Sequence, residues 1–282
     1  MRRLAWMLVL SLAGCAATPQ KNASPPAPPI VIHPREPDSL VLIPVTGPCN
    51  DVDVMECVRL AREQERLTEN QSRGAFVSSV YNHVVSKLDR ACTRGNLTAC
   101  AEVGHMYLIG LGAAVDQLHA VELFRLACVG DEAEGCMLLG RAYLEGITMP
   151  PDTAHAVTLL TMACERKNAE ACYRLAELYM SGAVVRRDVP RAAELFSDAC
   201  DHGSAIGCAR SGALHMRGDG VTRNSPRAAA LYLRACDGGK AYACWDLARM
   251  YATGAGVPQD TARAQALGTQ ACEGGYVPAC AR

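Results

Sequence analysis

The sequence predicts an all-α protein, a right-handed α/α solenoid of antiparallel helical hairpins that repeat every 36 residues. Three observations predict this class: the last six of seven cysteine pairs recur every 36 residues, apolar residues between the pairs follow helical spacing, and capping residues recur at equivalent positions. Each pair is spaced by eight residues, and the pairs are Cys49/Cys57, Cys92/Cys100, Cys128/Cys136, Cys164/Cys172, Cys200/Cys208, Cys236/Cys244 and Cys272/Cys280. Such a period is typical of repeat arrays, whose units bury their apolar faces only against neighbouring units.

The best-preserved repeat, from Cys244 to Cys272, shows the two helices of the unit. The first, termed the A helix, is marked by helically spaced residues at Cys244, Leu247, Ala248 and Tyr251. The segment 254–258 contains two glycines and a proline and interrupts it, and Asp260 is a candidate N-cap for the next helix. This second helix, termed the B helix, is marked by Ala264, Leu267, Ala271 and Cys272. Each repeat is therefore expected to be an antiparallel hairpin.

The same types of residue recur at equivalent positions every 36 residues along the chain. The B-helix N-cap position carries Asp116, Asp152, Asp188, Asn224 and Asp260. Its core position carries Leu123, Leu159, Leu195, Leu231 and Leu267, and a small residue for close helix approach recurs at Ala120, Ala156, Ala192, Ala228 and Ala264. A glycine suited to a left-handed turn after the B helix recurs at Gly95, Gly203, Gly239 and Gly275. Asp131 and Lys167 occupy this turn position in two repeats, where we expect more strain or a slightly different turn.

Residues 1–14 have the pattern of a lipoprotein signal peptide. Arg2 and Arg3 give a positive start, the apolar core of residues 4–12 is too short to span a bilayer, and small residues follow. The segment Leu12–Cys15 resembles the lipobox of bacterial lipoproteins, which implies diacylglyceryl transfer to the Cys15 thiol, cleavage after Gly14 and acylation of the new N-terminus. An ordinary cleaved leader is the alternative. The count of fifteen cysteines agrees with the lipoprotein, because it divides into Cys15 and seven pairs.

Residues 15–48 are expected to tether the repeats of residues 49–282 to the lipid. Residues 16–48 hold nine of the fifteen prolines and show no sustained helical period. In polyproline conformation this segment would reach roughly 100 Å. Its apolar clusters at 31–32 and 41–45 are interpreted as a short contact with the first repeat, with a partner-binding segment as the alternative.

Fourteen paired cysteines in an exported chain favour disulfides, because oxidising compartments preserve them. Zinc is the competing interpretation, but two cysteines eight residues apart lack the short spacing of zinc ligands. We therefore expect no metal and no cofactor.

Two stretches carry a resemblance to a known family. Tyr107-x2-Gly110-x-Gly112 and Tyr251-x2-Gly254-x-Gly256 are each followed by an Ala and Leu pattern, and they resemble the Sel1-like repeat. The resemblance extends from Cys49 to the C-terminus, and the regular cysteine pairs resemble the secreted cysteine-rich branch of that family. It implies seven disulfides that join the two cysteines of each pair, between the end of one B helix and the start of the next A helix. The geometry of antiparallel helix ends is compatible with such bonds.

Some repeats depart from the pattern. The first is seven residues longer around 68–73, and the chain ends before a seventh A helix, so six hairpins and a short stub are expected. In the fifth A helix His215 replaces the family's tyrosine and Ser211 its leucine, so that helix should pack less apolar bulk.

Catalytic motifs are sparse. The cysteine-rich branch includes members labelled β-lactamase or penicillin-binding, so a hydrolase acting on β-lactams or peptidoglycan is the alternative function. However, the sequence contains no Ser-x-x-Lys, Lys-Thr-Gly or His-Glu-x-x-His, and its seven histidines occupy non-equivalent positions. The net charge is −1, and removal of the two leader arginines would leave it near −3, which gives no support for a nucleic-acid partner.

The sequence therefore favours a binding surface without chemistry. Solenoids of this kind hold partners on the concave face lined by one helix layer. Within the A helix, positions one, two and five after the cysteine vary most, and we predict that partner-binding residues there are Tyr173, Arg174, Arg210, Trp245 and Arg249. A solvated face with one half-buried tryptophan is the alternative.

The predicted protein is a monomeric, lipid-anchored scaffold of the bacterial envelope that binds a protein, a peptide or a glycan polymer such as peptidoglycan. Outer-membrane residence facing the periplasm is expected because alanine follows Cys15, and surface exposure is the alternative.

Overall fold

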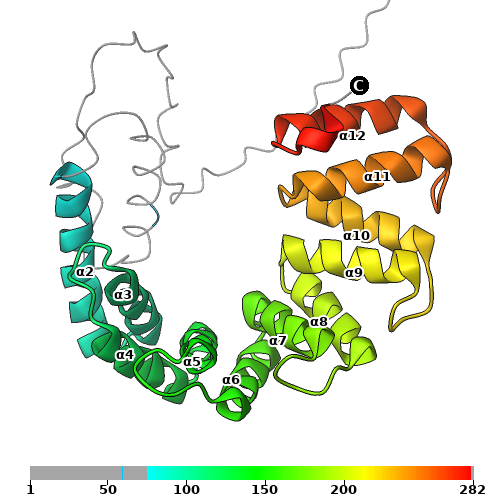
Figure 1. Ribbon diagram of the computed structural model, residues 1–282. Helices are drawn as coiled ribbons and strands as arrows, with labels where there is room; N and C mark the ends of the chain where they lie inside the picture. The colour runs from blue at the N-terminus through cyan, green and yellow to red at the C-terminus, as the bar shows by residue number, and fades with distance from the viewer. Residues whose placement is uncertain (1–58, 60–74, 281–282) are drawn as a thin grey trace, which may run out of the picture. The chain divides into compact units, whose positions relative to one another are not determined.

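The computed structural model describes residue 59 and residues 75–280. These residues form eleven α-helices and a final 3₁₀ turn, and they contain no strand (Figure 1). The elements are α2 (Ala75–Thr93), α3 (Leu97–Ile109), α4 (Gln117–Val129), α5 (Ala133–Glu145), α6 (Thr153–Glu165), α7 (Ala169–Ser181), α8 (Val189–Asp201), α9 (Ala205–Arg217), α10 (Ser225–Asp237), α11 (Ala241–Thr253), α12 (Thr261–Glu273) and η1 (Val277–Ala279). The predicted signal peptide, the tether and, apart from Arg59, the first A helix lie outside the described residues.

The helices alternate between two layers. The A layer consists of α3, α5, α7, α9 and α11, and the B layer consists of α2, α4, α6, α8, α10 and α12. Each helix packs against the next helix in the chain, as predicted for a solenoid of antiparallel hairpins (Figure 1). Contacts between alternate helices are most extensive in the A layer, where α3 packs beside α5 and α7 beside α9. The A layer is therefore the more closely spaced layer.

The predicted caps begin every complete B helix. The side chain of each N-cap accepts a hydrogen bond from a backbone N–H group three residues further on, and these caps are Asp116, Asp152, Asp188, Asn224 and Asp260. Side-chain caps also begin three A helices, at Asn96, Asn168 and Ser204. The α5 and α11 N-cap residues, Glu132 and Lys240, make no such bond. The start of each helix is thus fixed mainly by residues that recur with the repeat.

The turn between each B helix and the next A helix requires a left-handed residue. Gly95, Gly203, Gly239 and Gly275 have φ angles of 92°, 100°, 80° and 86°. Asp131 and Lys167 adopt the same conformation, with φ angles of 69° and 66°. The prediction for these two positions is confirmed: side chains with a β-carbon occupy a backbone region that glycine favours.

This difference predicts opposite effects of exchanging the residues of two equivalent turns. Lys167→Gly should raise the free energy of unfolding by about 1 kcal/mol, because it relieves the left-handed strain. Gly203→Lys should lower it by a similar amount, although a β-carbon there meets no atom within 4 Å. Chemical denaturation of both variants measures the two changes, and a stability loss in Lys167→Gly would contradict the explanation.

The core follows the two helix layers and is weakest at α9. The predicted B-helix leucines at 123, 195, 231 and 267 are buried, but Leu159 is only half-buried and Leu160 is fully buried beside it. The core divides into two clusters around α8 and α9. In α9 Ser211 is 2% exposed, and His215 Nδ1 is buried without a hydrogen-bond partner in the described region. The predicted loss of apolar bulk in this helix is confirmed.

Six disulfides connect the layers. They join Cys92–Cys100, Cys128–Cys136, Cys164–Cys172, Cys200–Cys208, Cys236–Cys244 and Cys272–Cys280. The Cα–Cα distances are 4.4–4.9 Å, within the usual range for disulfides. Each bond connects the last turn of a B helix to the next element, as the family resemblance implied. The Cys49–Cys57 pair lies outside the described residues.

Among the described helices, none is sufficiently long and apolar to cross a membrane.

Candidate partner-binding surface

The structure corrects the predicted role of one side-chain position in the A layer. The residue after the A-helix cysteine was expected to be exposed, but it is buried in four helices, at Ala101, Met137, Tyr173 and Ala209. Tyr173 is only 8% exposed, and its ring lies 5.7 Å from that of Phe196. Its hydroxyl donates a hydrogen bond to Glu177, and burial raises the pKa of this hydroxyl. Tyr173 is therefore a core residue and does not present an exposed ring to a partner.

Trp245 occupies the same position in α11 and is half-buried. Its ring centroid lies 6.5 Å from that of Tyr276, and it packs at the edge of the C-terminal core. Truncation of Trp245 would therefore remove packing contacts as well as surface. A binding test based on this residue would confound stability with affinity.

Of the predicted arginines, Arg210 and Arg249 are exposed and Arg174 is half-buried, and all three are paired with carboxylates of the same layer. Arg174 Nε lies 2.8 Å from Glu170, Arg210 lies 3.5 Å from Glu177, and Arg249 lies 3.8 Å from Asp246. Such partly exposed pairs contribute little to stability. The predicted positive strip is therefore a series of arginine–carboxylate pairs, which can exchange partners with an incoming charged group.

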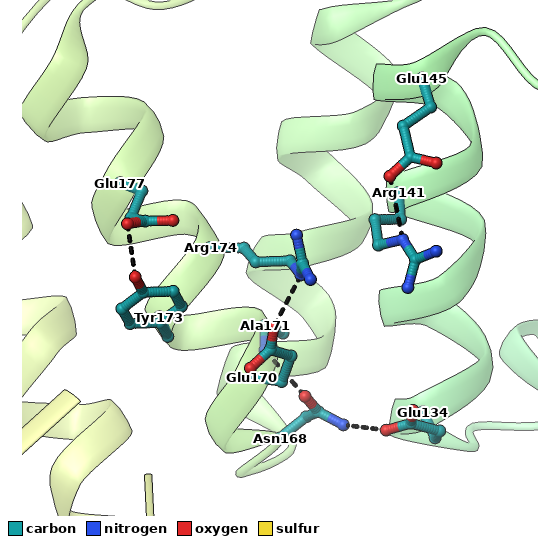
Figure 2. Close-up of polar contacts among 9 residues, drawn as sticks. All are labelled: Glu134, Arg141, Glu145, Asn168, Glu170, Ala171, Tyr173, Arg174 and Glu177. Atoms are coloured by element: carbon teal, nitrogen blue, oxygen red, sulfur yellow. Dashed lines mark hydrogen bonds and ion pairs between the residues drawn. The ribbon is translucent and has the colours of Figure 1, made fainter. Parts of the chain in front are cut away.

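A groove of about 340 Å³ opens between α3, α5 and α7, and we call it the polar groove. It is lined by Ala101, Glu102, His105, Glu134, Met137, Leu138, Arg141, Glu170 and Arg174. Figure 2 shows how its side chains are held: Arg141 contacts Glu145 one turn further along α5, and Arg174 contacts Glu170. The groove thus presents several carboxylates and two guanidinium groups.

Glu134 is a carboxylate of the polar groove and lies in the first turn of α5. Burial raises the pKa of its carboxyl, and the nearby Glu102 and Glu170 raise it further, whereas a 2.8 Å hydrogen bond from Asn168 Nδ2 lowers it. The Asn168 side chain also accepts a 2.8 Å hydrogen bond from the Ala171 backbone N–H and so caps α7 (Figure 2). Glu134 is therefore held at the junction of two repeats.

The raised pKa predicts how Glu134 affects stability. A carboxyl whose pKa is higher in the folded state than in the unfolded state favours folding when it is protonated and opposes folding when it is ionised. Its contribution therefore lowers the free energy of unfolding as the pH rises above the ordinary pKa of about 4.3. Glu134→Gln should therefore raise the melting temperature at neutral pH, and this gain should vanish in acid. Melts across this pH range measure the effect, with the exposed Glu165→Gln as the control. An equal gain at all pH values would contradict the electrostatic explanation.

A larger groove, of about 470 Å³, opens between α7 and α9, and we call it the apolar groove. Its lining residues are Glu177, Leu178, Met180, Ser181, Phe196, Arg210, Ala213, Leu214 and Arg217. The aliphatic, aromatic and methionine side chains provide apolar walls, while Glu177 and two arginines provide charge. Arg217 is paired with Asp219 at 2.6 Å, so both arginines have carboxylate partners. This combination suits a peptide segment with apolar side chains and an acidic group.

Sequence reasoning identified part of these two grooves. It placed Arg174 and Arg210 correctly on the A layer, and the two residues line separate grooves. It also selected Trp245 and Arg249, which line neither. It missed residues near the end of each A helix, such as Met180 and Arg217. The repeat position of Met180 carries Leu, Met or Ala, and the repeat position of Arg217 carries Ile, Glu, Ser, Arg or Thr. This variation was the available signal.

Within residues 75–280, no group of three or more histidine, cysteine, aspartate or glutamate side chains is arranged to hold a metal ion.

The family model described as Sel1 repeat matches residues 97–128, 133–168, 169–204, 205–240 and 241–276. The chain belongs to the Sel1 repeat family. Each match covers one repeat, and together they span all five complete hairpins. No curated protein sequence matches the chain.

Several solved structures share the fold of this chain. A Sel1 repeat protein from Oxalobacter formigenes has a TM-score of 0.65 at 22% identity, over 80% of this chain and 86% of that chain. A protective antigen of uropathogenic Escherichia coli, c5321, has a TM-score of 0.64 at 21% identity, over 80% of this chain and 50% of that chain. The immunity protein PA5088 from Pseudomonas aeruginosa has a TM-score of 0.51 at 18% identity, over 83% and 84% of the respective chains.

Proposed function

We propose that this Sel1 repeat protein is a scaffold that binds a protein partner, through an extended peptide segment, on the A layer. The observation that carries the proposal is that two grooves open between successive A helices on this layer, and that one of them has apolar walls with charged residues at its edge. Repeat solenoids use such extended surfaces to bind partners. The two arginines of the apolar groove can exchange their present carboxylate partners for a carboxylate on a peptide that also carries apolar side chains.

Affinity capture tests this function. The purified protein should retain a defined protein from envelope extracts, and Ala213→Arg, which adds bulk to the apolar groove, should weaken that retention. Hydrolysis of a β-lactam or of peptidoglycan by the purified protein, with no retained protein, would contradict the scaffold function and favour the hydrolase.

The disulfides support an extracytoplasmic location. Six bonds formed between cysteines of neighbouring repeats are typical of proteins in oxidising compartments. We propose that the lipid at Cys15 and the proline-rich segment of residues 16–48 hold the scaffold at the outer membrane, facing the periplasm. The tether would let the binding surface reach partners away from the bilayer.

Mass spectrometry of the mature N-terminus tests the anchor. We expect the protein to begin at Cys15, with a diacylglyceryl group on the thiol and an acyl chain on the amine. Cys15→Ser should release the protein from the membrane fraction while leaving the melting temperature of the repeats unchanged. An unmodified Cys15, or a mature chain that begins elsewhere, would contradict the anchor.

A further inference from the structure

Exposed apolar side chains distinguish the hairpin of α3 and α4 from the other repeats. Five of the seven large apolar side chains that are exposed within residues 81–280 belong to this hairpin and its loop: Ile109, Val115, Leu118, Leu126 and Val129. Three of them lie on α4, where Leu118, Leu126 and Val129 are 69%, 51% and 80% exposed. Isolated exposed apolar residues are ordinary, but several on one short helix indicate an interface.

The other repeats provide an internal comparison. The position of Val129 carries Thr93 in α2 and an acidic residue in α6, α8, α10 and α12: Glu165, Asp201, Asp237 and Glu273. The position of Leu126 carries Arg90, Met162, Asp198, Arg234 and Gln270, and the position of Leu118 carries Asn82 in α2 and alanine or proline in the later B helices. The hairpin fold therefore does not require large apolar side chains at these three positions. Their presence on α4 needs another explanation.

The spacing on α4 is that of a helix-packing seam. Leu118, Glu122, Arg125 and Val129 follow one another at intervals of four, three and four residues, so they lie along one face of the helix. Glu122 and Arg125 form an ion pair at its centre, with side chains that are 62% and 60% exposed. We call these four residues of α4 the stripe. The stripe has an apolar residue at each end and one charge of each sign in the middle.

We propose that α4 is a self-association surface that packs antiparallel against α4 of a second copy of this chain. In an antiparallel pair related by a two-fold axis, Leu118 lies opposite Val129 of the second copy, and Glu122 lies opposite its Arg125. Each apolar end meets the other apolar end, and each charge meets its opposite, so the stripe is complementary to itself. This proposal departs from the monomer that the sequence led us to expect.

Self-complementarity favours a second copy over other occupants. A lipid surface would favour several cations around the apolar residues, whereas this stripe carries one acidic and one basic side chain at its centre. The contact of a single helix buries less than the about 800 Å² per partner of a standard interface, so we expect association on the order of 10–100 μM. The A layer remains free to bind its partner in such a dimer, because the stripe belongs to the B layer.

A charge exchange tests the pairing. A photo-crosslinking amino acid in place of Leu126 should yield an adduct of twice the chain's mass when the purified full-length protein is irradiated at about 100 μM. Glu122→Arg should reduce the adduct about tenfold, because two arginines would then face each other across the axis, and Arg125→Glu should do the same. An equal mixture of these two variants should restore the adduct, since the all-basic and all-acidic stripes are complementary.

Two further variants separate pairing from misfolding. Val129→Glu introduces the residue found at this position in α6 and α12, so the hairpin should fold while the dimer is lost. Glu194→Arg, at the position in α8 equivalent to Glu122, should leave the adduct unchanged. Absence of a dimer adduct, an adduct of another mass, or a dimer that survives Glu122→Arg would overturn the proposal.

Discussion

Reduction of the disulfides should unfold most of the repeat array at about 37 °C. In the chain-entropy model, a loop of about nine residues contributes roughly 2.5 kcal/mol per bond, so six bonds contribute on the order of 15 kcal/mol. This total equals or exceeds the net stability of an ordinary domain, about 5–15 kcal/mol. The contacts between helices cannot replace it easily, because much of the core consists of alanine side chains, which bury little apolar area.

Thermal melts followed by circular dichroism, with and without a reductant, measure this effect. Alkylation of the reduced thiols should make the loss of helix permanent, which serves as a control for reoxidation. Among single bonds, loss of Cys200–Cys208 should have the largest effect, because it connects α8 to α9, where the core divides. Loss of Cys272–Cys280 at the end of the array should have the smallest. A shift of only a degree or two on full reduction would show that packing alone holds the array.

Ala213→Arg should weaken capture of the protein partner by about 2 kcal/mol or more, a factor of roughly thirty. Ala213 is half-buried in the wall of the apolar groove, and an arginine there would occupy space that the partner needs. The substitution should leave the fold intact, because Arg141 and Arg249 occupy the equivalent position in α5 and α11. The loss should therefore appear in the binding constant with little change in the melting temperature.

The matched control places the same change on the opposite layer. Ala230 is exposed on α10, which forms a hairpin with α9, so Ala230→Arg adds the same charge and bulk to the B layer of that hairpin. Its binding constant should equal that of the unmodified protein. If Ala230→Arg weakened capture as strongly as Ala213→Arg, the change in net charge would explain both losses, and the apolar groove would not be the binding site.

The fold could be predicted in detail because its determinants are local and recur with the repeat. Each N-cap such as Asp260 acts within one turn of its own helix, and the left-handed turn residues act within the same few residues. Even the exceptions at Asp131 and Lys167 were identified, because a fixed turn position allows the residue there to be compared between repeats. The prediction for Leu159 was less accurate: Leu159 was expected in the core, but it is half-buried and its neighbour Leu160 is fully buried instead.

The binding surface was predicted less well because it depends on contacts between repeats. Variation at the Tyr173 position suggested exposure, yet residues as different as alanine, methionine and tyrosine are buried there. Tyr173 fills its site because Phe196 of the following B helix lies beside it. The apolar groove likewise depends on the distance between α7 and α9, which no single repeat encodes. Periodicity therefore identifies the A layer but not the place on it where a cavity remains.

Crosslinking in living cells tests directly whether the partner lies on the A layer. A photo-crosslinking amino acid would replace Ser181, which is exposed in the apolar groove, or Thr158, which is exposed on α6 of the B layer. We predict that Ser181 gives an adduct with one defined envelope protein and that Thr158 does not. An adduct with that protein from Thr158 and none from Ser181 would show that the partner binds the B layer and not the A layer.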